Sequence, residues 1–307
     1  MNATTDTVRV SGPKELLSVV PHLLGFQPEN SVILVFMTDD AVTLTMRMDD
    51  TIALSSERDM RAAFQRGVLH EPEAVAAIVW SENPSAILRA DIIGDVLADL
   101  GVHVQDVLTV KGGRWKSALC TAPECCPPEG KPLPTNTVAA VEMIAHGSAP
   151  AASRDDALPD LTPRGEAGSN PPKDDQAVLD AAERALEMTP EELAEALHSI
   201  RVRDAILWDL AQDGIDYGPW IDALAAATRA SRPNSAAPAA TTYAMAAYLS
   251  GNGVTAGKAL EVAIESDPDY SLSALLVTAI SAGVPPKVLR EALQQTTREE
   301  CLTGVNE

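Results

Sequence analysis

The feature that most constrains the fold is an unbroken apolar run at 31–37, SVILVFM, followed at once by the strictly alternating stretch VTLTMRM at 42–48. A continuous apolar run of this length is typical of a buried strand, and alternation is typical of a strand with one buried face. The connector at 38–41 has hairpin length and carries turn-forming aspartates. Together these stretches predict a β-hairpin within a sheet.

The pattern continues over the first 120 residues. Three further stretches predict strands: AVAAIVW at 74–80, VQDVLTV at 104–110 and RWKSAL at 114–119. Gly112-Gly113 separates the last two, and glycine at both positions is a strong hairpin signal because both can adopt positive φ. Helical spacing of apolar residues appears between the strands. Residues 1–150 are therefore expected to form a mixed α/β sheet domain of two or three layers.

The second half of the chain has a different character. Residues 151–175 are expected to form a linker, because most of this stretch is rich in proline, glycine and charge. Residues 176–307 contain only helical patterns, including the capping box TPEE at 189–192. Gly-Val recurs at 253 and at 283, which suggests helix-turn-helix repetition. This part is expected to be an all-α helical-hairpin, repeat-like domain.

The charge excludes one class of partner. Residues 1–150 carry 11 Lys/Arg and 19 Asp/Glu, and residues 151–307 carry 12 and 25, giving the net charge of −21. Both parts repel a phosphate backbone, so no nucleic-acid partner is expected. No apolar run approaches a membrane span, and the polar start MNATTDTVRV lacks the apolar core of a signal peptide. We therefore expect a cytoplasmic protein without a membrane partner.

Three of the four cysteines lie in RWKSALCTAPECCPPEG. Cys120 and Cys125 have the spacing of half a zinc site, but no second cysteine pair follows and the five histidines stand alone. Cys126 precedes a proline, so it is expected to be extended and to point away from Cys125. The sequence favours a packed turn with reduced thiols, in which Cys120 and Cys126 are the more buried. Zinc held by Cys120, Cys125 and a distant histidine, or a reversible Cys120–Cys125 disulfide, remain alternatives.

Four residues are candidates for binding a small ligand. Arg114 follows the glycine turn and could bind an anion, and Trp115 is the next residue in the chain. Arg47 and Asp49 lie at the end of the alternating strand. Asp49 and the adjacent Asp50 form a pair of carboxylates, and such pairs can hold a cation or transfer protons. No catalytic residue is assigned, because GxSxG, HExxH, GxGxxG and the phosphate-loop pattern are absent. These absences weigh against an enzyme and predict no organic cofactor.

Three stretches, in this order, resemble the actinobacterial family catalogued as domain of unknown function 4192. They are PKELLSVVPHLLGFQPENSVILV, RWKSALCTAPECCPPEGKPLP and SGNGVTAGKALEVAIESDPDYSLSALL. The resemblance implies a bacterial cytoplasmic protein with an α/β part followed by helices, and it implies no activity. The last stretch also resembles a degenerate tetratricopeptide repeat.

These observations leave three hypotheses for function. The first is a protein-interaction or regulatory binding protein, because stacked helical hairpins form surfaces that bind protein partners. The second is an enzyme or small-ligand binder with a pocket at the strand ends of the α/β domain. The third is a zinc-stabilised structural domain.

Overall fold

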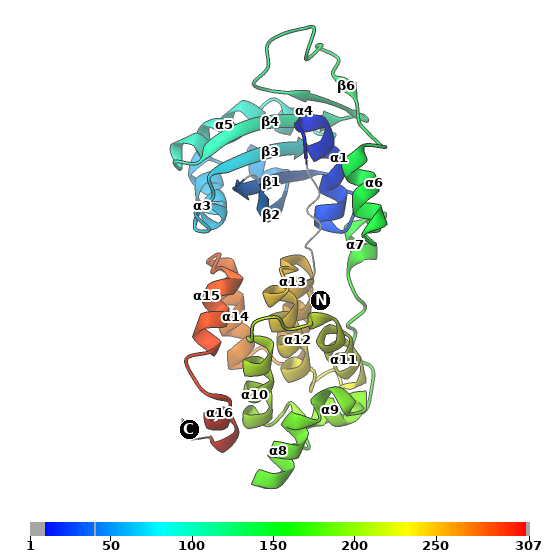
Figure 1. Ribbon diagram of the computed structural model, residues 1–307, viewed down its shortest axis with the longest axis vertical. Helices are drawn as coiled ribbons and strands as arrows, with labels where there is room; N and C mark the ends of the chain where they lie inside the picture. The colour runs from blue at the N-terminus through cyan, green and yellow to red at the C-terminus, as the bar shows by residue number, and fades with distance from the viewer. Residues whose placement is uncertain (1–9, 40, 305–307) are drawn as a thin grey trace. The chain divides into compact units, whose positions relative to one another are not determined.

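The computed structural model describes residues 10–39 and 41–304. Asp40 of the predicted hairpin turn and the first nine residues therefore lie outside the described residues. The chain divides into two compact units, Met1–Ala157 and Leu158–Glu307, here called the α/β unit and the helical unit (Figure 1). The first contains a mixed sheet with helices and the second contains packed helix pairs, which confirms the predicted fold class.

The α/β unit is built on a six-stranded sheet with the order β2-β1-β3-β4-β5-β6. Neighbouring strands are antiparallel except for β3 and β4, which are parallel and joined through helices. All five predicted strands are present, and β6 is an addition. The strands are β1 Ser31–Thr38, β2 Ala41–Asp49, β3 Ala74–Trp80, β4 His103–Lys111, β5 Arg114–Ser117 and β6 Lys131–Pro132.

Helices cover both faces of this sheet (Figure 1). Phe36 and the other even-numbered apolar residues of β1 pack with α3 and α5, and Ile33 and Val35 pack with α1 and α6. Burial on both faces explains why β1 is apolar at every position from Val32 to Met37. The helices are α1 Pro13–Leu24, α2 Thr51–Leu54, α3 Glu57–Val68, α4 Pro84–Ile87, α5 Ala90–Asp99, α6 Val138–Ala145 and α7 Arg154–Ala157.

The turn between β4 and β5 has the predicted chemistry. Gly112 and Gly113 have φ angles of 56° and 69°, so both occupy the left-handed region that favours glycine. The hairpin places β5 beside β4 in the register Val110 opposite Trp115. This pairing carries the chain to the cysteine-containing segment.

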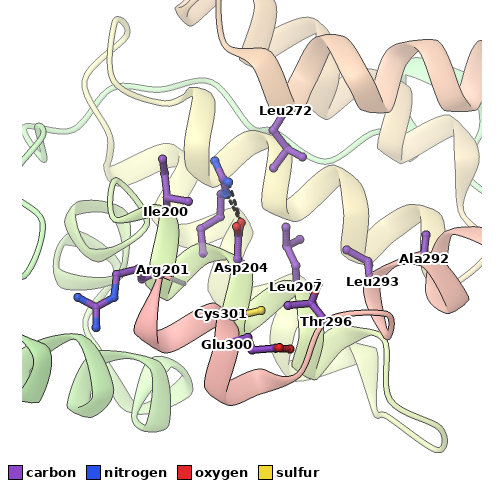
Figure 2. A pocket seen from close by; sticks show the side chains of 12 residues that line it. Ile200, Arg201, Asp204, Leu207, Leu272, Ala292, Leu293, Thr296, Glu300 and Cys301 are labelled. Carbon is purple, nitrogen blue, oxygen red and sulfur yellow. Dashed lines mark hydrogen bonds and ion pairs between the residues drawn. The ribbon is translucent and has the colours of Figure 1, made fainter. Parts of the chain in front are cut away.

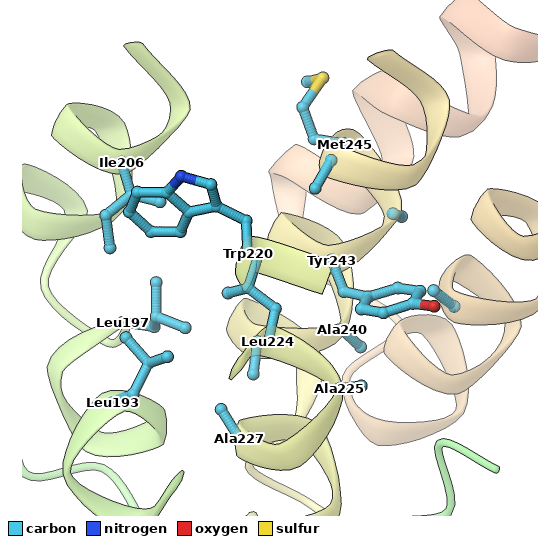
Figure 3. Close-up of a cluster of buried hydrophobic side chains, with 14 of the residues drawn as sticks. Leu193, Leu197, Ile206, Trp220, Leu224, Ala225, Ala227, Ala240, Tyr243 and Met245 are labelled. Atoms are coloured by element: carbon cyan, nitrogen blue, oxygen red, sulfur yellow. The ribbon is translucent and has the colours of Figure 1, made fainter. Parts of the chain in front are cut away.

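The helical unit is packed around α12 (Figure 3). Apart from Tyr243, Tyr248, Met245 and Leu249, the residues of α12 are alanine, proline or threonine, and every residue of this helix except Tyr248 is buried. Such small side chains allow neighbouring helices to approach closely. The predicted capping box at Thr189 and Glu192 is present. The elements are α8 Asp175–Glu183, η1 Ala185–Glu187, α9 Pro190–Ala196, α10 Ile200–Leu210, α11 Tyr217–Ala230, α12 Ala237–Leu249, α13 Gly253–Ser266, α14 Ser271–Ser281, α15 Pro286–Leu293 and α16 Arg298–Thr303.

Part of the predicted linker at 151–175 packs on the helical unit. The backbone N–H groups of Arg164 and Gly165 donate to the Arg229 carbonyl oxygen, each at 3.0 Å. Leu161 and Ala167 belong to the buried core of the helical unit. Composition predicts a mobile tether over this stretch, whereas these contacts attach its middle to the end of α11.

Within the described part of the chain, no helix combines the length and the apolar character that crossing a membrane requires.

Candidate metal centre

The residues between β5 and β6 form a loop whose two ends lie side by side. Arg114 pairs with Pro132 and Trp115 with Lys131 across the two strands. Gly130 closes the loop with a φ of 74°, and a Cβ there would lie 2.8 Å from the Trp115 carbonyl oxygen. Glycine suits both the angle and the close approach. Strand pairing therefore determines where the cysteine-containing segment begins and ends.

Arg114 ties the far end of this loop to β5. Its Nε donates to the Glu129 carbonyl oxygen at 2.8 Å, and its Nη2 donates to the Gly130 carbonyl oxygen at 2.7 Å. The adjacent Trp115 is buried in the core, with the Lys131 Nζ 5.7 Å from its ring centroid. Arg114 and Trp115 thus form the framework of the loop, and the guanidinium that was a candidate for binding an anion already has protein partners.

Cys125 and Cys126 lie on a tight turn at 122–126, and Cys120 lies just before it. The backbone N–H groups of Cys125 and Cys126 both donate to the Ala122 carbonyl oxygen, at 3.1 and 2.7 Å. The expectation that Cys126 points away from Cys125 is wrong, because this turn curls the chain and brings the two Sγ atoms within 4.8 Å. Pro123 was the available signal, since proline suits the second position of a turn.

The turn brings three thiols together. The Sγ atoms of Cys120, Cys125 and Cys126 all lie within 4.8 Å of one another. Cys120 and Cys126 are half-buried and Cys125 is exposed, which confirms the expected order of exposure. The spacing alone identified Cys120 and Cys125, and the structure adds Cys126 as a third possible ligand.

A buried hydroxyl positions the first of these cysteines. Ser117 Oγ accepts hydrogen bonds from the backbone N–H groups of Leu119 and Cys120, each at 3.1 Å. The same hydroxyl donates to Asp106 Oδ1 at 2.6 Å. Asp106 lies on β4, so this chain of hydrogen bonds connects the backbone of Cys120 to the sheet.

The environment separates the thiols electrostatically. Hydrogen bonds from the Ala122 backbone and then from the Cys126 side chain lower the pKa of Cys120. A backbone hydrogen bond from Ser117 lowers the pKa of Cys126, but burial and the neighbouring Cys120 outweigh it and the net pKa is raised. Cys120 therefore ionises before Cys126. A thiolate is the form of cysteine that binds a metal.

The other two candidates for binding a small ligand, Arg47 and Asp49, lie far from Arg114 and Trp115. Arg47 Nη1 forms an ion pair with Asp49 Oδ1 at 2.7 Å, and its Nε donates to Ser31 Oγ at 2.8 Å. Both residues belong to β2, which β1, β3 and β4 separate from β5. At about 4.8 Å per strand, β2 and β5 are roughly 19 Å apart. The structure therefore does not bring Arg47 and Asp49 together with Arg114 and Trp115.

The helical unit contains a separate open cavity of about 370 Å³ between α10, α14, α15 and α16 (Figure 2). Leu207, Leu272 and Leu293 contribute apolar lining, and Arg203 and Asp204 contribute charge. The Arg203 guanidinium is held by Asp204 Oδ1 and by the Tyr270 hydroxyl, each at 2.8 Å from its donating nitrogen. No sequence pattern indicated this cavity, because its lining comes from helices distant in the chain.

One comparison with known proteins gives a match. A family model described as "Domain of unknown function (DUF4192)" matches residues 13–191 and 173–287, which together run through both units. No curated protein and no solved structure matches the chain.

Proposed function

Since this chain belongs to the DUF4192 family, whose description assigns no function, we propose a function from its own side chains: a regulatory binding protein that holds one soft metal ion. The observation that carries this proposal is the convergence of three Sγ atoms within 4.8 Å. Thiolates favour soft or borderline ions such as Zn²⁺ and Cu⁺ over Mg²⁺ and Ca²⁺.

The spacing of the thiols suits a shared ion. Zn–S bonds of about 2.3 Å place two sulfurs of a tetrahedral site about 3.8 Å apart. Sulfurs that already lie within 4.8 Å reach this separation by moving about 1 Å or less. A disulfide requires two sulfurs at about 2.0 Å and a restricted dihedral angle. Two sulfurs 4.8 Å apart therefore need to move less to share a metal ion than to form a disulfide.

The test is a metal titration of the full chain, stripped with a chelator and kept in a phosphine reductant. Adding Co²⁺ as a spectroscopic probe is expected to produce thiolate-to-metal charge-transfer absorption that saturates at one ion per chain. Zn²⁺ is expected to displace Co²⁺ and abolish the absorption.

Four serine variants assign the site. Cys120→Ser, Cys125→Ser and Cys126→Ser are each expected to weaken or abolish the signal. Cys301→Ser is the matched control, because it removes a half-buried thiol of the helical unit and leaves the three turn cysteines in place, so it is expected to retain the charge-transfer absorption. Absence of charge-transfer absorption in the wild type, or its persistence when all three turn cysteines are replaced, would overturn the proposal.

A separate observation favours a second candidate function, the binding of a protein partner by the helical unit. The open cavity presents leucines beside charged side chains, as an amphipathic segment requires. Residues 151–307 carry 12 Lys/Arg and 25 Asp/Glu, so long-range attraction selects a basic segment. We propose an amphipathic helix with lysines beside its apolar face as the occupant.

Two leucines of α14 test this second function. Leu272 lines the cavity, whereas Leu275 is 67% exposed and does not. A fluorescent peptide with leucines on one helical face and lysines on the other is expected to bind the wild type with salt-sensitive affinity. Leu272→Ala is expected to weaken binding at least about tenfold, which is about 1.4 kcal/mol, and Leu275→Ala to leave it unchanged. No binding by the wild type, or an equal loss in both variants, would contradict this function.

A further inference from the structure

We propose that the three-cysteine centre is an open metal site, in which an external thiolate completes the coordination of an exchangeable ion. This inference rests on the proposed metal binding and adds to it the class of the fourth ligand. An open site can pass a metal ion to another thiol or accept one. A closed site, in contrast, surrounds a permanent structural ion.

The number of available ligands is the first argument. Among residues 10–39 and 41–304, the group of convergent ligand atoms contains Cys120, Cys125 and Cys126 and no histidine or carboxylate. Structural zinc sites are closed by four protein ligands, and sites with three protein ligands leave the fourth position to water or substrate. Three thiolates therefore place this centre in the open class.

The exposure of the centre is the second argument. Cys125 is exposed, whereas Cys120 and Cys126 are half-buried. An ion bound between them is consequently accessible on the side of Cys125. An incoming thiolate can reach the ion from solvent without unfolding of the loop.

The third argument is that the loop is held by contacts that need no metal. Arg114 binds the carbonyl oxygens of Glu129 and Gly130, and Ser117 binds the backbone N–H of Cys120. These bonds hold both ends of the segment that carries the thiols. Loss of the ion therefore leaves the three ligands in place, and metal exchange requires this. In a loop that folds only around its metal, the ligands would separate when the ion leaves.

The exchange step conserves atoms and charge. A thiol in solution loses its proton to buffer, its sulfur forms a bond to the ion, and the ion's bond to a solvent water breaks. No electron is transferred, so neither oxidant nor reductant is needed. Transfer of the metal then breaks the ion's bonds to the three cysteine sulfurs, which take up protons from buffer, while water or further external thiolates fill the vacated positions on the ion as it leaves with the external thiolate.

The experiment uses the full chain loaded with Co²⁺ in a phosphine reductant, which is not itself a thiol. Adding glutathione as a small thiol is expected to intensify the charge-transfer absorption and shift the d–d bands to those of a four-sulfur centre. Binding of Co²⁺ without any response to glutathione, at concentrations that leave the metal bound, would overturn the open site while the proposed metal binding stands. Absence of Co²⁺ binding would overturn both.

The fourth thiolate has a second possible source, which is Cys301 of a second copy. Size-exclusion chromatography of the metal-loaded chain separates the two. A monomer that responds to glutathione identically in wild type and Cys301→Ser assigns the position to a small thiol. Metal-dependent dimerisation that Cys301→Ser abolishes assigns it to a second copy, and it supports the open site equally.

Arg114 supplies an independent test of the preformed loop, as a positioning residue that does not touch the metal. Arg114→Ala removes the bonds to Glu129 and Gly130 and is expected to weaken metal affinity by about 10–100-fold, the range found for residues that orient metal ligands. Lys116→Ala is the matched control, because it removes an exposed positive charge from the same strand. Equal affinities of the two variants would show that the loop clamp does not prepare the site.

Discussion

Replacing Gly165 with alanine tests whether the middle of the 151–175 stretch is bound to the helical unit. A methyl carbon at this position would lie 1.9 Å from the Ala230 carbonyl oxygen and 2.3 Å from its carbonyl carbon. Both are backbone atoms of the last residue of α11, and they cannot rotate aside as a side chain can. The variant therefore either strains the contact or releases the segment.

The magnitude follows from what either outcome costs. Adding a methyl group to a fully packed site typically costs about 1–3 kcal/mol. Releasing the segment instead exposes Leu161, which is 2% exposed in the fold and whose burial is worth about 2 kcal/mol. It also breaks the backbone hydrogen bonds to Arg229, although the freed chain regains conformational entropy. We expect Gly165→Ala to lower the free energy of unfolding by about 2 kcal/mol.

Urea denaturation followed by circular dichroism measures the change, and limited trypsin digestion reports on cleavage after Arg164. Gly168→Ala is the matched control in the same segment, because its methyl carbon would lie 3.3 Å from Arg232 Nη1, the end of a flexible side chain. We expect the control to stay within about 0.5 kcal/mol of the wild type and to resist digestion equally. If Gly165→Ala matched Gly168→Ala in both assays, the segment would be the mobile tether that its composition predicts.

Three further substitutions have defined outcomes. Gly67→Ala places a methyl carbon 2.2 Å from two ring atoms of Phe36, so urea denaturation should show a loss of about 1–3 kcal/mol; an unchanged midpoint would contradict the packing. Gly257→Ala lies inside α13 with no atom within 4 Å of the new methyl, and it should gain about 0.5–1 kcal/mol in the same assay, whereas a loss would refute the open space. Hydrogen bonds from the Thr162 backbone, and then from a neighbouring arginine, lower the pKa of Asp160 from 3.8 to about 2. Because the folded-state pKa is depressed, the stability advantage of the wild type over Asp160→Asn should be complete above pH 3.8 and disappear as the pH falls through about 2. A difference in stability that stays constant over this pH range would contradict the depressed pKa.

The types of the secondary-structure elements were predictable because their signals are local. The unbroken apolar run at 31–37 indicated a buried strand, and β1 is indeed buried on both faces along most of its length. Gly112-Gly113 indicated a turn with two positive φ angles, and both are positive. Periodicity, capping and glycine content act between residues a few positions apart, so they can be read directly from the chain.

The thiol cluster was only partly predictable. The spacing of Cys120 and Cys125 indicated a possible pair, but the direction of Cys126 was predicted wrongly. The rule that adjacent side chains point in opposite directions applies to extended chain, and the bonds to the Ala122 carbonyl oxygen replace extended chain with a turn. The three Sγ atoms converge as a result.

Local signals along the chain are enough to predict one unit with a sheet and one of helices, together with the strands, turns and helix caps inside them. Which distant groups meet depends on how the whole chain packs. Arg114 binds loop carbonyls fifteen and sixteen residues away in the chain, and Gly165 packs against Ala230. No short-range pattern encodes such contacts, because they arise when the chain closes into densely packed units.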